Sequence, residues 1–184
     1  MRPRAYLDIE GIASQDNGLT ASVLRGRLMA IMHSCFRATP ARYAIALPLD
    51  RSKIRVFADS RAAFDTLVNA LQPNRWMRDY ARIGYPHEVP ENFAGPWVAY
   101  RRYRIPTLKS DRNAEDGLSR LRDRRIEHAR TQGLEYFQAR SAGNLQAFTL
   151  TVEQVRVDAP TLDCQPNSYG LGTTTNTFAV PLLP

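Results

Sequence analysis

The order of strand-like and helix-like segments in residues 1–90 constrains the fold of this chain more than any other feature. In this region, segments in which apolar residues alternate, as in a strand, follow segments in which they recur about every 3.6 residues, as in a helix. Turn residues such as Asn17-Gly18 separate them. The expected elements are, in order, a strand at 5–11, a helix at 20–35, strands at 43–47 and 54–58, a helix that Ser60 caps, and a strand between 76 and 89. The order β-α-β-β-α-β is that of the ferredoxin-like, split βαβ unit. We therefore predict an α+β fold that begins with a ferredoxin-like domain.

A second domain is expected after a change of composition near residues 90–97. Pro90, Gly95 and Pro96 mark a linker, which divides the chain into a ferredoxin-like domain at 1–95 and a C-terminal domain at 96–184. A helix is expected at about 115–132, with Gly133 as its stop, and the clearest strand at 148–157. The C-terminal domain is therefore predicted to hold one arginine-rich helix and short antiparallel strands.

The charge of the chain points to a polyanionic partner. The formal net charge is +7, and all but Lys53 and Lys109 of the 25 basic residues are arginine. The planar guanidinium binds phosphates and guanine edges with two hydrogen bonds and stacks on bases. This composition favours nucleic acid over a membrane surface. A genome that prefers arginine codons is the alternative explanation.

The predicted arginine-rich helix is the first candidate for RNA binding. Ten Arg or Lys residues stand against five Asp or Glu residues between Arg101 and Arg130. Arg120 and Arg124 share one helical face, and Arg125 lies on a neighbouring one. Such a helix can contact phosphates of both strands of an RNA hairpin, although the major groove of A-form RNA is deep and narrow. A solvated helix with pairs of opposite charge is the alternative.

A second basic segment, Tyr100-Arg101-Arg102-Tyr103-Arg104, precedes this helix. Strand alternation would place Arg102 and Arg104 on one side, where two arginines can read consecutive guanine edges. The alternative is a sheet edge that charge protects from pairing with another strand.

Three histidines are the candidates for acid–base chemistry. His33 lies off the face of the first helix that carries Leu24, Leu28 and Ile31, so it can project into a cleft. His87 follows a proline in a turn, and His128 lies in the arginine-rich helix. A purely structural histidine is the competing interpretation at each position.

Metal, membrane and secretion signals are not found in the sequence. No His, Cys or acidic residues have a metal-ligand spacing, and no apolar run approaches the length of a membrane span. Cys35 and Cys164 are read as reduced thiols. A cytoplasmic protein without a metal or other cofactor is expected.

Taken in order, four stretches resemble the family of type I-F CRISPR repeat endoribonucleases over nearly the whole chain. They are Tyr6-Leu7-Asp8-Ile9, then Ile31-Met32-His33-Ser34 with Tyr43–Pro48 nine residues later, then Arg102-x-Arg104 with Gly117–Arg120, and finally Ser168-Tyr169-Gly170-Leu171. The last is the most specific of the four. The resemblance implies the function of this family, which is to process CRISPR repeat transcripts.

The resemblance also implies roles for single residues. His33 would be the catalytic histidine, Tyr169 would orient its ring, and Ser141 would hold the ribose 2′-OH that attacks the scissile phosphate without metal. Arg102 would read a guanine near the base of the stem, and Arg104 stands where the family usually has glutamine. The remaining RNA-binding residues would be Phe148, which stacks under the closing base pair, and Arg120, Arg124 and Arg125 of the helix.

The family further implies partners. The chain would cut a CRISPR repeat stem-loop at its base, leave a 2′,3′-cyclic phosphate, and stay on the 3′ hairpin of the crRNA with the backbone and other subunits of a type I-F Cascade complex. The Thr-rich tail and Arg104 resemble the branch of the family found with CRISPR-associated transposons, and this resemblance implies a TniQ-type transposition protein as a partner. The rival hypotheses are a non-catalytic subunit that binds an RNA hairpin, and a structural subunit that holds the RNA backbone without reading its sequence.

Overall fold

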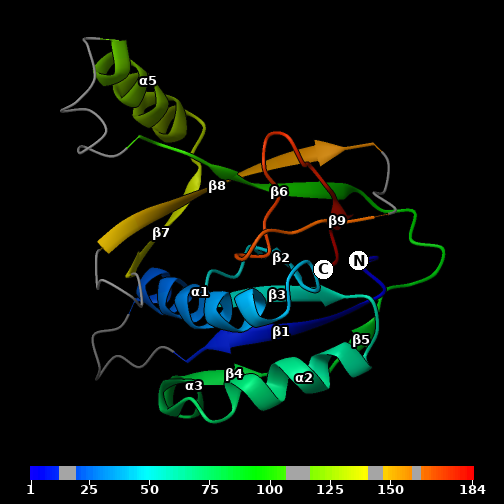
Figure 1. The fold of residues 1–184 in the computed structure, drawn as a ribbon. Helices are drawn as coiled ribbons and strands as arrows, with labels where there is room; N and C mark the ends of the chain where they lie inside the picture. Colours follow the sequence, from blue (N-terminus) through cyan, green and yellow to red (C-terminus); the bar gives the residue numbers. More distant parts are fainter. Residues whose placement is uncertain (13–19, 107–116, 141–146, 159–162) are drawn as a thin grey trace.

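The computed structural model describes residues 1–12, 20–106, 117–140, 147–158 and 163–184. It has an α+β fold in which two antiparallel sheets lie one above the other (Figure 1). The α+β class predicted from the sequence is therefore confirmed. Among the described helices, none is both long and apolar enough to cross a membrane.

The first sheet consists of strands from the N-terminal half. Its strands are β1 (Ala5–Gly11), β2 (Ala44–Ala46), β3 (Lys53–Ala58), β4 (Ala81–Ile83) and β5 (His87–Glu88). They are ordered β2-β3-β1-β4, and β5 pairs with the other end of β1. β3 therefore lies between β1 and β2, the two strands that α1 (Ala21–Ala38) connects. The ferredoxin-like assignment itself stays a prediction.

Two details of the predicted order are wrong. The segment expected to hold a single strand contains α3 (Arg75–Tyr80), followed by β4 and β5, because the Asn74 side chain accepts a hydrogen bond from the backbone N–H of Met77 and caps a helix there. Ser60 does not cap α2 (Ala62–Leu71), since its hydroxyl donates to Asp59 instead. Two short elements are thus added to the predicted set.

The second sheet consists of strands from the C-terminal half. Its strands are β6 (Trp97–Tyr103), β7 (Glu135–Arg140), β8 (Ala147–Val157) and β9 (Val180–Pro181), in the order β7-β8-β6-β9. The arginine-rich helix α5 (Gly117–Thr131) lies at one end of the molecule, on the side of the second sheet (Figure 1). It ends before Gly133, whose φ of 60° is the left-handed conformation expected of a helix stop.

Helix α1 contacts β1 of the first sheet and β7 of the second. Leu28, Met29, Met32 and Phe36 are buried, whereas Ile31, predicted to share a face with Leu24 and Leu28, is only half-buried. At Gly26 the helix approaches β7 so closely that a Cβ atom would lie 2.6 Å from the carbonyl oxygen of Gln138. Glycine therefore permits this contact between helix and strand.

One cluster of buried apolar side chains includes residues from both halves of the chain, among them Leu28 of α1, Tyr100 of β6 and Phe137 of β7. The division into domains at residues 95 and 96 stays a prediction. What matters for the site is that α1 is held from two sides, so side chains near its C-terminal end keep a defined position.

Candidate active site

His33 lies in the second half of α1 and is half-buried. Its ring is stacked on that of Tyr169, with 4.0 Å between the centroids and 7° between the planes. Its Nδ1 lies 2.8 Å from the carbonyl oxygen of Ser168. A carbonyl oxygen only accepts hydrogen bonds, so Nδ1 carries the proton and Nε2 of the neutral ring holds the free lone pair. This tautomer is the one that a general base acting through Nε2 requires.

The segment that carries Tyr169 is held to both sheets by backbone hydrogen bonds. The carbonyl oxygen of Gly170 accepts from the backbone N–H of Ile45 in β2 at 2.9 Å, and Gly172 exchanges two such bonds with β6, donating to Tyr100 and accepting from Arg102. The side chain of Asn167 accepts from the backbone N–H of Tyr169 at 2.8 Å. Both sheets thus take part in placing Tyr169 over α1.

Gly170 makes this turn possible. Its φ is +73°, and a Cβ atom there would lie 2.8 Å from Ile45 and 3.0 Å from Phe36. Any other residue would meet both the strain of this conformation and a collision with the core. The Tyr-Gly-Leu stretch in the sequence therefore has a direct structural reason.

Arg102 and Phe148 complete the cluster around Tyr169. The guanidinium carbon of Arg102 lies 5.5 Å from the centroid of the Tyr169 ring, and the Phe148 ring meets it edge-on at 6.3 Å. Burial raises the pKa of the Tyr169 hydroxyl, while the positive charges of Arg102 and Arg37 act in the opposite direction. Four residues predicted from the sequence, namely His33, Arg102, Phe148 and Tyr169, thus lie together.

The arginine-rich helix is attached to the same strand as Arg102. The rings of Tyr103 and His128 are stacked at 5.6 Å, and the guanidinium of Arg125 lies 5.8 Å from the Tyr103 centroid. Nη1 of Arg125 also donates to the carbonyl oxygen of Arg104. Because Arg102 and Tyr103 are adjacent in β6, the helix and the His33 cluster are joined through one strand. His128 and Arg125 therefore hold the helix in place.

Not every predicted site residue joins the cluster. Arg104 lies beyond the end of β6, so the strand alternation that would put it beside Arg102 does not extend to it, and its side chain is exposed. Arg124 is exposed on α5. Ser141 and the side chain of Arg120 lie outside the described residues. His87, expected in a turn, belongs to β5 and stacks on Tyr6 at 5.4 Å.

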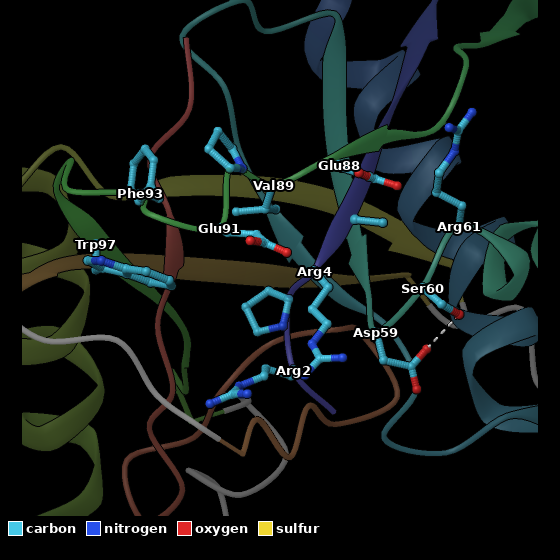
Figure 2. A pocket seen from close by; sticks show the side chains of 13 residues that line it. Arg2, Arg4, Asp59, Ser60, Arg61, Glu88, Val89, Glu91, Phe93 and Trp97 are labelled. Carbon is cyan, nitrogen blue, oxygen red and sulfur yellow. Dashed lines mark hydrogen bonds between the residues drawn. The ribbon is translucent and has the colours of Figure 1, made fainter.

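A surface hollow of about 760 Å³ lies away from this cluster. Figure 2 shows Arg2 and Arg4 on one side of it and Phe93 and Trp97 on another, and none of the four clustered residues lines it. An RNA stem binds along an exposed face of a protein and does not need a hollow of this size, so the position of the hollow does not argue against the His33 cluster. Its lining carries positive charges from arginines as well as negative charges from Asp59, Glu88 and Glu91. This mixture of charges does not favour any one class of ligand.

Sequence reasoning missed two features of the site. The carbonyl of Ser168, which sets the His33 tautomer, has no signal in the sequence because any residue could supply it. Arg37 follows His33 by four residues, which is a helical spacing, but it lies two residues beyond the end of the helix predicted at 20–35.

Comparison with known proteins supports the resemblance inferred from the sequence. A family model described as CRISPR-associated protein (Cas_Csy4) matches residues 6–182. The match includes all four clustered residues and the arginine-rich helix. No curated protein matches the chain.

Proposed function

Since the chain belongs to the type I-F CRISPR repeat-processing endoribonuclease family, we propose that it cuts the repeat RNA at the base of a stem-loop, without metal, and stays on the 3′ hairpin. The family itself consists of CRISPR endoribonucleases that bind repeat RNA and work with a CRISPR-associated complex. The observation that best supports cleavage without metal is the position of the His33 ring, which is stacked on Tyr169 with its Nδ1 against the Ser168 carbonyl.

The reaction would proceed by attack of the ribose 2′-OH on the adjacent phosphate. Nε2 of His33 takes the proton of the 2′-OH while the 2′ oxygen forms a bond to phosphorus. The bond from phosphorus to the 5′ oxygen breaks, the leaving oxygen takes a proton from water, and the imidazolium returns its proton to solvent. The products are a 2′,3′-cyclic phosphate and a 5′-OH. A positioned general base contributes about 10²–10⁴ in rate, and holding the nucleophile in line contributes further.

The remaining residues would bind and place the RNA. Arg102 reads a guanine at the base of the stem, Phe148 stacks under the closing base pair, and α5 contacts phosphates of the stem. Ser141 holds the 2′-OH, and Arg104 reads a neighbouring base. The proximity of Arg102 and Phe148 to the Tyr169 ring supports the first two roles. The TniQ-type partner has no support in the family match and stays a prediction.

We predict that the purified protein cuts its cognate repeat RNA at full rate in excess EDTA, because a histidine and not a bound metal ion would take the 2′-OH proton. The measurement is a single-turnover cleavage assay on labelled RNA, with the 3′ end of the upstream product tested for a cyclic phosphate by its resistance to phosphatase. Cleavage that stops in EDTA and returns with Mg²⁺ would contradict the proposed mechanism.

A second prediction separates sequence reading from phosphate binding. Arg102→Ala should reduce the preference for the cognate base pair at the bottom of the stem by about 1–3 kcal/mol, because it removes a guanine contact. Arg120→Ala should instead weaken binding to all stem sequences and lower the salt dependence. Binding is measured on a set of stems that differ in one base pair at several salt concentrations. An equal loss on every stem for both variants would contradict this division of roles.

A further inference from the structure

We propose that Arg37 binds the scissile phosphate beside His33 and stabilises the charge that it gains during cleavage. This inference rests on the proposed nuclease function and adds a residue to it. Arg37 lies in the last turn of α1 and is exposed, so its guanidinium can meet the RNA.

The helix geometry places Arg37 next to the catalytic ring. Residues four apart on an α-helix share a face, with about 5–6 Å between their Cβ atoms. His33 and Arg37 both belong to the regular part of α1. A phosphate bound at Nε2 of His33 would therefore lie near the helix face that also carries Arg37.

The charges around Tyr169 support the same position. Arg37 is close enough for its positive charge to act on the Tyr169 hydroxyl, as does that of Arg102. The guanidinium of Arg102 therefore lies against the Tyr169 ring, and Arg37 adds a second positive charge on the helix that carries His33. Among the ion pairs between described residues, none includes Arg37 or Arg102. Two cations that pair with no carboxylate in the described part of the chain, beside a half-buried histidine, favour a phosphate ligand.

The reaction explains why such a cation would act on the rate. As the 2′ oxygen bonds to phosphorus and the 5′ oxygen leaves, negative charge accumulates on the non-bridging oxygens of the phosphate. A guanidinium already in place stabilises this charge more than that of the starting phosphate. Arg37 would thus lower the barrier more than it raises the affinity for RNA.

The test compares the variants Arg37→Ala and Arg37→Lys with the control variant Arg27→Ala. Arg27 is also exposed but lies on another face of the same helix, so its removal takes away a charge without changing the proposed phosphate contact. Arg37→Ala should cut about 10²-fold more slowly in single turnover, while its affinity for RNA with a 2′-deoxyribose at the cut changes far less. Arg37→Lys should restore part of the rate because it keeps the charge but not the forked geometry. Arg27→Ala should cut at the normal rate.

A sulfur substitution at the scissile phosphate distinguishes phosphate contact from a structural role. With the unmodified protein, replacing the non-bridging oxygen that Arg37 contacts should slow cleavage, and this penalty should shrink in Arg37→Ala. An unchanged penalty, a normal rate in Arg37→Ala, or equal slowing in Arg27→Ala would each overturn the inference. Failure of the unmodified protein to cut its repeat would refute the proposed function instead, before any variant is compared.

Discussion

His33→Ala is expected to lower the rate of repeat-RNA cleavage by about 10²–10⁴-fold and to leave RNA affinity nearly unchanged. In the proposed mechanism this ring is the acid–base group. Its Nδ1 is engaged by the Ser168 carbonyl, which leaves Nε2 for proton transfer. The measurement combines single-turnover cleavage with binding to the same RNA carrying a 2′-deoxyribose at the cut.

Two controls test whether the loss comes from this ring alone. His87→Ala removes an exposed histidine on β5 and should cut normally. Tyr169→Phe keeps a ring to stack on His33 and should cut much faster than Tyr169→Ala, which leaves the imidazole without its neighbour at 4.0 Å. If His33→Ala cuts at the normal rate, the chain is better described as an RNA-binding subunit without turnover.

The parts of the fold that depend on local periodicity were predicted well from the sequence. The strand at 5–11 has the bounds expected, because buried and half-exposed side chains alternate along all of β1. The predicted arginine-rich helix ends within one residue of the observed end, because Gly133 takes the left-handed conformation that stops it. Such signals lie within a few neighbouring residues, so they can be read without tertiary structure.

Elements whose ends depend on side-chain hydrogen bonds were predicted less well. Asn74 and Ser60 are both good N-cap residues, but only Asn74 bonds the first turn of a helix. Arg104, predicted by strand alternation to lie on the same side as Arg102, is the first residue after the end of β6, so the alternation of that strand does not place it. Each error follows from a competition between contacts that the sequence alone does not resolve.

The candidate site depended on the family resemblance, since composition and spacing left each histidine equally open to a structural role. Placing His33 against Tyr169 requires two segments 136 positions apart to meet through β2 and β6.

Arg25 is a second residue whose role could not be predicted from the sequence. It lies eight residues before His33 on α1 and has no motif around it, yet it is only 1% exposed.

Arg25→Met is expected to destabilise the protein by about 3 kcal/mol, because it removes one partner of a buried ion pair. Nη1 of Arg25 donates to Glu135 at 2.6 Å, and Nη2 donates to the carbonyl oxygens of Pro48 and Asp50 at 3.0 and 2.6 Å. Burial lowers the pKa of the Arg25 guanidinium, and Glu135 opposes this effect. Since the Glu135 side chain keeps 22% exposure and can be partly solvated, the expected loss lies at the lower end of the range for buried pairs.

The loss is measured by urea unfolding, with Arg27→Met as the matched control because Arg27 is exposed on the same helix. Arg27→Met should leave the midpoint unchanged, and Arg25→Met combined with Glu135→Gln should recover part of the loss, since the unpaired carboxylate is then neutral.

Arg25 fixes α1 to β7 and to the segment after β2, but it does not touch the His33 cluster. The folded fraction of Arg25→Met should therefore still cut RNA at the normal rate. Equal midpoints for the two methionine variants would show that the buried pair contributes nothing, and slow cutting by a fully folded Arg25→Met would show that the position of His33 depends on it.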